Sequence, residues 1–272
     1  MKKYSLLSGL IASIVALSAS NALSQDAATI YSDASGTLVT WDNTSGQYPV
    51  IDAVLSQAGA VSGTHTYTSW SFLAQDGDGS LDVFGSLSGL GYTPTVGDAI
   101  SVSGTYSPFH QIPEIETVTA ITLQSSGNTP AAPKVLTIPS LNVASLPEGI
   151  AGHLIEVDNV TIGGSGGVGG LFPTYAQATT ATETFTMTDG GGHSMTLFDW
   201  VTSYSTCAAF GGEAVPAGPV DIIGFDSVFT TGTSSTAEFT PIEIITVPEP
   251  ATMGLCGAGG LLALIIRLRR KA

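Results

Sequence analysis

The sequence predicts an all-β protein whose body consists of two tandem copies of one small unit, with an apolar segment at each end of the chain. Thr, Val, Ile and aromatic residues dominate the interior, and Gly-, Asp- and Pro-containing turn clusters interrupt it at short intervals. No long stretch carries apolar residues at helical spacing without a Gly, Pro or Thr interrupting it. The third observation is an internal repeat.

The repeat consists of three blocks that recur in the same order. "SFLAQDGDGSLDVFG" is answered by "TFTMTDGGGHSMTLFD", "VSGTYSPF" by "IIGFDSVF", and "PEIETVTAITL" by "TAEFTPIEIITV". Blocks that keep their order imply two copies of one β unit. The paired positions are Phe72 with Phe185, Asp76 with Asp189, Gly104 with Gly224, and Phe109 with Phe229.

The predicted domain organisation has five parts. They are a signal peptide (1–24), a first β domain (27–128), a Pro-rich joint (129–149), a second β domain (150–246) and a C-terminal sorting segment (247–272). The joint contains Pro130, Pro133, Pro139 and Pro147, so we expect it to be extended rather than helical.

The body resembles a known fold family. "FLAQDGDGSLDVFG", "VGDAISVSGTYSPFHQIPEI" and "GIAGHLIEVDNVTI" are similar to the OB-fold-type domains of secreted bacterial proteins. The resemblance implies two tandem OB-like barrels, each small and partly open with five strands. The chain departs from nucleic-acid-binding members of the family because it lacks a cationic groove, so the fold is expected to carry over without that ligand.

The N-terminus has the order of a secretory signal peptide. Met1-Lys2-Lys3 precedes an apolar stretch from Leu6 to Leu17, and small residues follow. Cleavage is expected after Ala22 or after Ser24. This implies export through the Sec translocon and removal of the N-terminal helix by signal peptidase.

The C-terminus carries a short apolar run from Ala251 to Ile266, which as a helix spans about 24 Å. A hydrocarbon core is about 30 Å thick, so we expect a marginal transmembrane helix. The basic cluster after it places the C-terminus in the cytoplasm. That cluster is Arg267, Arg269, Arg270 and Lys271.

The residues before this run complete a recognisable tail. Val247, Pro248, Glu249, Pro250 and Ala251, followed by the apolar span and the basic cluster, resemble the PEP-CTERM sorting segment. The resemblance implies an exosortase as partner, a membrane-held form in transit, and delivery to the surface or extracellular matrix of a Gram-negative-type bacterium. A plain membrane anchor is the alternative.

The charge of the body excludes polyanion binding. Between residues 25 and 250 there are 22 acidic residues and one cation, Lys134, which gives a formal charge of −21. Nucleic-acid affinity comes largely from Lys and Arg on phosphates, so we expect no nucleic-acid partner. Such a surface suits solubility, cations or a neutral sugar.

A candidate calcium site lies in "DGDGSLD". Asp76, Asp78, Ser80 and Asp82 place oxygen side chains at alternate positions, as hard cations require. The positions that would complete an EF-hand loop are leucines, Leu81 and Leu87. The alternative is a hairpin turn in which Asp-Gly supplies positive φ angles, and the repeat copy "DGGGHS" favours that alternative.

Candidate ligand-binding residues are Trp70 and Trp200, which lie on the strands that form the usual ligand face of an OB-type sheet. Exposed rings there could stack on sugar faces, and the alternative is that they fill the core. No set of nucleophile, base and orienting group stands out, so no catalytic residue is assigned.

Three functions follow from these observations. The first is a non-catalytic exported protein that binds neutral polysaccharide, such as exopolysaccharide. The second is a calcium-assisted hydrolase or an accessory domain of an extracellular enzyme. The third is a purely structural matrix protein, bridged by cations.

Overall fold

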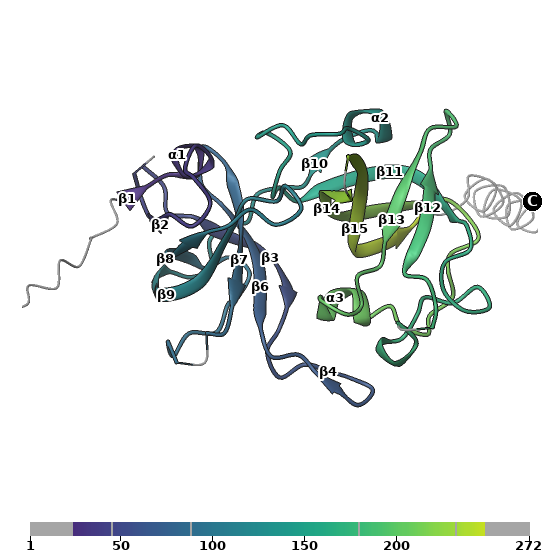
Figure 1. Cartoon of the computed structure of the whole chain (residues 1–272), viewed down its shortest axis with the longest axis horizontal. Helices are drawn as coiled ribbons and strands as arrows, with labels where there is room; N and C mark the ends of the chain where they lie inside the picture. Colours follow the sequence, from purple (N-terminus) through teal and green to yellow (C-terminus); the bar gives the residue numbers. More distant parts are fainter. Residues whose placement is uncertain (1–23, 45, 88, 179, 232, 248–272) are drawn as a thin grey trace, which may run out of the picture.

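The computed structural model describes residues 24–247, except for 45, 88, 179 and 232, and most of its elements are strands (Figure 1). The expected signal helix and C-terminal transmembrane helix lie outside the described residues. Within the described part, no helix has the length and apolar character needed to cross a bilayer.

The first half of the chain forms a closed five-stranded barrel, the first barrel. In ring order its strands are β3 (Val50–Ser56), β6 (Trp70–Gln75), β7 (Ser80–Gly85), β9 (Glu114–Ser125) and β8 (Ala99–Tyr106), which pairs again with β3. Only β7 and β9 are parallel neighbours in this ring. The smaller elements are β1 (Ser24–Gln25), α1 (Ala27–Tyr31), β2 (Leu38–Trp41), β4 (Val61–Ser62) and β5 (His65–Thr66).

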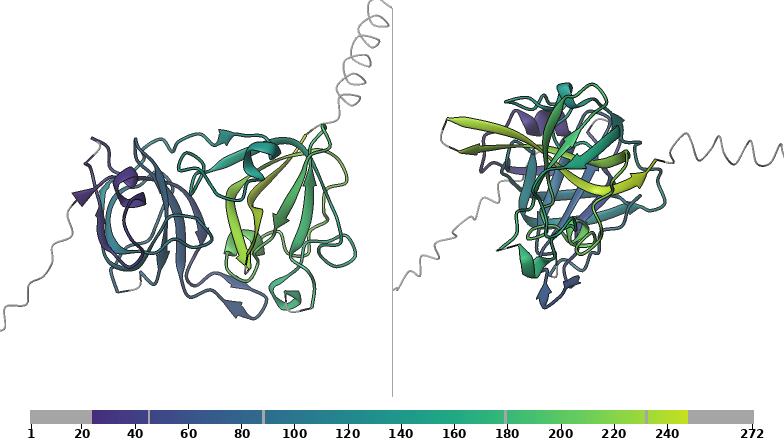
Figure 2. Two further views of the ribbon diagram at one scale, coloured as in Figure 1. Left: turned by 45° about the horizontal axis from the view of Figure 1, so that its top comes forward. Right: turned by 90° about the vertical axis from the view of Figure 1, so that its right-hand side faces the viewer.

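The second half forms another closed five-stranded barrel, the second barrel, beside the first (Figure 2). Its ring is β11 (Ile155–Gly163), β12 (Thr184–Thr188), β13 (Ser194–Phe198), β15 (Ser234–Thr246) and β14 (Val220–Thr231), which pairs again with β11. Again only one pair, β13 with β15, is parallel. The smaller elements are β10 (Lys134–Val135), α2 (Ile138–Leu141), the 3-10 helix Tyr175–Gln177, and α3 (Ser205–Ala208).

The two barrels share one connectivity. When the strands of each ring are numbered along the chain, both rings run 1-2-3-5-4. Phe72 and Phe185 lie in the second strand of their respective barrels, and both are buried. The repeat found in the sequence therefore corresponds to equivalent positions in two barrels.

The paired aspartates Asp76 and Asp189 begin equivalent hairpin turns. Asp76 accepts hydrogen bonds from the backbone N–H groups of Asp78 and Gly79, and Asp189 accepts from Gly191 and His193. The predicted hairpin is therefore present in both copies. In the first copy, Gly77 and Gly79 do not have the positive φ angles expected of them, and the side chain of Asp76 closes the turn instead.

The paired glycines lie in the fourth strand of each barrel, opposite a bulge in the fifth strand. The pairing of β8 with β9 shifts between Ser103 and Thr105, and that of β14 with β15 shifts next to Gly224. A Cβ at Gly104 would lie 2.7 Å from the carbonyl oxygen of Glu116, and one at Gly224 would lie 2.1 Å from that of Thr240. A side chain is therefore excluded where the last two strands approach and bend to close the ring.

Each barrel encloses its own core, and a third apolar cluster joins them. The first core includes Trp41, Phe72 and Ile100, and the second includes Met187, Ile222 and Phe239. The third cluster consists of residues from both barrels: Ala53, Leu55, Leu73, Ile112, Tyr204, Cys207 and Phe225.

The joint between the barrels differs in part from the extended segment predicted for 129–149. One turn of helix, α2, occupies Ile138–Leu141, and Pro139 lies in its first turn. Proline is tolerated there because the first N–H groups of a helix have no intrahelical partner. The expectation that the prolines exclude helix is therefore wrong at this turn.

We predict that Gly224→Ala lowers the free energy of unfolding by more than about 2 kcal/mol, because the new methyl group overlaps the backbone of β15. Gly190→Ala is the matched control: a Cβ there meets nothing within 4 Å, and its φ is not positive. Urea denaturation of both variants measures the difference. Equal stability would contradict the bulge argument.

Candidate functional site

The two barrels meet through the outer face of β3 and β6. Ile51 and Phe72 point into the first core, while Leu55 and Leu73 belong to the cluster shared with the second barrel. This explains why almost every residue of β6 is buried. Hydrogen bonds cross the same boundary, among them those from the Tyr67 hydroxyl to the Val201 carbonyl and from the Thr206 hydroxyl to the Leu55 carbonyl (3.0 Å).

An aromatic patch lies at this junction around Trp200. The junction patch consists of Phe109, His110, Phe198, Trp200 and Phe229. Phe109 stacks on Trp200 at 5.6 Å between ring centroids, and His110 contacts Phe229 at 5.1 Å. Phe109 and Phe229 are 41% and 44% exposed, so both offer ring surface to a ligand.

The first barrel contributes to the patch through a strained turn. His110 and Gln111 have φ angles of 50° and 65°, although neither is glycine. Backbone hydrogen bonds between Phe109 and Ile112 close this turn, and the His110 carbonyl accepts from Val228 N of the second barrel at 2.8 Å. Burial lowers the pKa of His110, which favours the neutral form of its ring. Contacts with the second barrel thus hold an unfavourable backbone in place.

A cleft of about 260 Å³ opens from the same boundary. One wall comes from the first barrel and the segment before β6, and the other from the loop that follows Trp200. The junction cleft is lined by Ser56, His65, Tyr67, Thr68, Ser69, Phe84, Thr202 and Ser203. Its lining contains three rings and six hydroxyl groups, with neither a carboxylate nor a Lys or Arg.

The two tryptophans chosen from the sequence have different environments. Trp70 is 8% exposed and belongs to the core of the first barrel. Trp200 is half-buried and is the centre of the junction patch. The structure therefore does not bring them together, and only Trp200 lies beside exposed rings.

The four oxygen side chains proposed for calcium do not converge. Asp76 is buried, and its carboxylate also accepts from Ala27 N (2.9 Å) and Trp41 Nε1 (2.7 Å). Ser80 donates to the carbonyls of Ala74 and Gly152, and Asp82 accepts from Ser71 Oγ. Asp78 is exposed on the turn. Protein donors therefore already occupy Asp76 and Asp82, and this arrangement does not support the calcium hypothesis.

Another acidic group was missed in the sequence. Carboxylate oxygens of Glu156, Asp158 and Asp221 lie within 4.8 Å of one another on β11 and β14, and no other such trio occurs in the described residues. Partial burial, and then Asp158 and Asp221, raise the pKa of Glu156. Pairing of the second barrel's first and fourth strands brings them together, and nothing in the sequence indicated that register.

Several carboxyl groups are buried around the junction and in the first barrel. Burial raises the pKa of Asp52 to about 7 and those of Asp199 and Asp226 to about 8. Asp82 and Glu114 are neighbours on β7 and β9, and burial raises the pKa of both. Neither oxygen of Asp199 has a hydrogen-bond partner among the described residues. These groups are therefore neutral over much of the pH range in which an exposed carboxyl is charged.

Comparison with known proteins identifies the tail. Residues 246–271 match the PEP-CTERM protein-sorting motif, which supports an exported protein that crosses the membrane and is sorted by an exosortase. No curated protein matches the chain in sequence. A solved structure of a replication protein A heterotrimer bound to single-stranded DNA aligns over 90% of this chain and 72% of its own, with 10% identity and a TM-score of 0.26. A TM-score of 0.26 does not establish a shared fold.

We predict that stability falls as the pH rises from about 5 to about 8. A carboxyl with a raised pKa stays protonated in the folded state at a pH where the same group in the unfolded chain has lost its proton. Unfolding therefore releases protons, and a rising pH favours the unfolded state. One pKa unit is worth about 1.4 kcal/mol, so we expect a loss of more than about 2 kcal/mol in urea denaturation.

Asp226→Asn should reduce this pH dependence, because the amide mimics the protonated acid and does not titrate. The exposed Asp78→Asn is the matched control and should leave the dependence unchanged. Stability that rises over the same pH interval would contradict the proposed protonation of the buried acids.

Proposed function

We propose that the protein is a non-catalytic component of the cell surface or exopolysaccharide matrix, sorted by an exosortase, whose body binds neutral polysaccharide at the junction of two OB-type barrels. The single observation that carries the binding proposal is the boundary between the barrels, where residues of both barrels form the junction patch with its exposed rings and also the hydroxyl-lined junction cleft without charged groups. Signal peptidase and the Sec translocon are the further partners that this route requires.

The OB assignment rests on connectivity. Both rings have the order 1-2-3-5-4, with the third and fifth strands parallel, and both are small five-stranded barrels. We propose domain boundaries at 27–128 and 150–246, with the joint 129–149 between them. The first-barrel side of the junction cleft is then formed by Ser56 at the end of the first strand, Phe84 on the third strand and the segment between the first and second strands. OB folds commonly bind oligosaccharides on the face of the second and third strands and at the loop between the first and second.

A neutral glycan fits the chemistry of the junction. The apolar faces of sugar rings stack on aromatic rings, and hydroxyl groups on the protein exchange hydrogen bonds with those on the sugar. A polyanionic ligand would be repelled by a body with 22 acids and one Lys. The rings and hydroxyls of the junction patch and the junction cleft are thus complementary to an uncharged polyol.

We propose no hydrolytic role for the carboxyl groups with raised pKa values. A general acid must reach its substrate, whereas Asp82, Asp199 and Asp226 are each at most 1% exposed. The acidic trio Glu156, Asp158 and Asp221 favours the rival in which the protein is structural and bridged by cations. In that case the patch would bind no glycan.

We predict that Phe109→Ala and Phe229→Ala each weaken binding to a neutral polysaccharide by roughly five- to tenfold, because each removes an exposed stacking surface. Affinity electrophoresis in gels containing hydroxyethylcellulose, laminarin or dextran measures the effect. Leu123→Ala is the matched control, because Leu123 is 47% exposed on β9 and belongs to neither the patch nor the cleft. Absence of retardation in all three gels would contradict the proposal.

We predict that the exported protein lacks the C-terminal residues after the sorting motif. Mass spectrometry of protein released from a host with an active exosortase should find no peptide that contains Arg267 to Lys271. A host without the enzyme is the control and should retain the complete chain. Recovery of the chain through Ala272 from the active host would indicate a plain anchor.

A further inference from the structure

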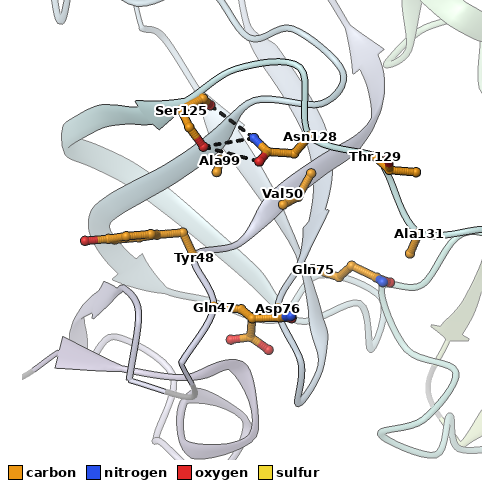
Figure 3. A pocket seen from close by; sticks show the side chains of 10 residues that line it. All are labelled: Gln47, Tyr48, Val50, Gln75, Asp76, Ala99, Ser125, Asn128, Thr129 and Ala131. Carbon is orange, nitrogen blue, oxygen red and sulfur yellow. Dashed lines mark hydrogen bonds between the residues drawn. The ribbon is translucent and has the colours of Figure 1, made fainter.

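The first barrel has a second and larger cleft, of about 440 Å³ (Figure 3). It lies where β3 begins and β6 ends, and the segment after β9 forms its other wall. The far cleft is lined by Gln47, Tyr48, Val50, Gln75, Asp76, Ala99, Ser125, Asn128, Thr129 and Ala131. Its volume is within the range of clefts that hold small ligands.

The far cleft and the junction cleft lie at opposite ends of the same two strands, β3 and β6. Val50 lines the far cleft and Ser56 the junction cleft, at opposite ends of β3. Gln75 and Ser69 mark the same two ends along β6. Six residues of extended strand span about 20 Å, so a single sugar ring cannot occupy both clefts.

The lining of the far cleft is polar but carries no available charge. Gln47 and Gln75 contribute carboxamides, which both donate and accept hydrogen bonds, and the carboxamide of Asn128 is engaged within the wall itself. Tyr48 contributes a ring and a hydroxyl group. The one acid, Asp76, is engaged by four N–H donors, so it is an unfavourable cation ligand. Carboxamides beside a tyrosine suit a neutral sugar, whose hydroxyl groups both donate and accept hydrogen bonds.

The wall that contains Asn128 is already in place without a ligand. Its Nδ2 donates to the carbonyls of Gly97 (2.9 Å) and Ser125 (3.3 Å), and its backbone N–H also donates to Gly97. Gly97 has a φ of 87°, and a Cβ there would lie 2.7 Å from the Asn128 carbonyl oxygen. A preformed wall reduces the entropy lost on binding.

We propose that the far cleft is a second glycan-binding site, and that the protein therefore holds two segments of neutral polysaccharide at once. The inference rests on the proposed function for the class of ligand, but it concerns other residues at the other end of the barrel. A protein with two glycan-binding sites can cross-link polysaccharide chains, whereas a protein with one site can only attach to a single chain. The protein would thus contribute to the cohesion of a matrix.

Titration calorimetry of the full chain in mild detergent tests the proposal, with the glucose hexasaccharide that corresponds to the polysaccharide causing retardation. We expect two hexasaccharides bound per protein. Thr129→Trp should fill the far cleft and leave one bound hexasaccharide, because Thr129 is exposed on the rim of that cleft. Thr122 is exposed on β9 away from both clefts, so Thr122→Trp is the control and should still bind two hexasaccharides.

Gln47→Ala is a second variant, which removes a side chain from the far cleft instead of filling it. It should lower the affinity of the site that is lost in Thr129→Trp by roughly threefold. Viscosity of the matching polysaccharide should rise with the wild-type protein and not with Thr129→Trp. Phe109→Ala should weaken only the other site.

The outcomes separate the two proposals. One site in the wild-type protein that persists in Thr129→Trp would overturn the far cleft and leave the junction assignment standing. One site that Thr129→Trp removes and Phe109→Ala does not affect would overturn the junction and support the far cleft. No binding of any hexasaccharide would overturn both.

Discussion

The scarcity of cations constrains the whole body. With Lys134 as the one Lys or Arg among 22 acids, a buried carboxylate cannot be stabilised by a salt bridge, and Lys134 itself donates to the Gly149 carbonyl. Two solutions remain for a buried acid. Asp76 accepts hydrogen bonds from four N–H donors, and these bonds fix α1, Trp41 and the β6–β7 turn to one another. Asp199 and Asp226 instead lie in apolar surroundings, where the neutral form is favoured.

The same constraint makes the contact between the barrels apolar. Leu55, Leu73 and Phe225 supply the contact surface, and the hydrogen bonds around them go mainly to carbonyl groups. Because β3 and β6 are buried on both faces, the orientation of the barrels is tied to the packing of the first core. The junction patch depends on that orientation, since Phe109 belongs to one barrel and Trp200 to the other.

Much of the fold could be predicted from the sequence, because the repeat is expressed in residues with strict backbone roles. Gly104 and Gly224 occupy equivalent repeat positions because a side chain is excluded at both bulges. Asp76 and Asp189 do so because each closes a hairpin turn. The strand character of the interior followed from composition. The helix at Ile138–Leu141 could not be predicted from the number of prolines, because Pro139 lies in the first turn, where proline is compatible with a helix.

The candidate site could be predicted only in part, because it depends on contacts between the barrels. Trp70 and Trp200 look alike in sequence, yet one fills a core and the other faces the partner barrel. The alternating acids of "DGDGSLD" suggested a cation, but the N-terminal segment that supplies Ala27 N and Trp41 Nε1 to Asp76 is distant in sequence. The far cleft is built from four separated segments, and no local pattern marks it.

Duplication explains how two similar barrels produce one composite site. Phe109 and Phe229 are repeat partners, and each lies near the end of the fourth strand of its own barrel. In a single barrel either ring would be an isolated exposed hydrophobic. In the tandem arrangement both contact His110, at 4.1 and 5.1 Å, and Phe109 also stacks on Trp200. Because the turn at His110 and Gln111 is strained, its geometry depends on the hydrogen bond from Val228. The exposed aromatic surface is therefore a property of the pair of barrels and not of either copy alone.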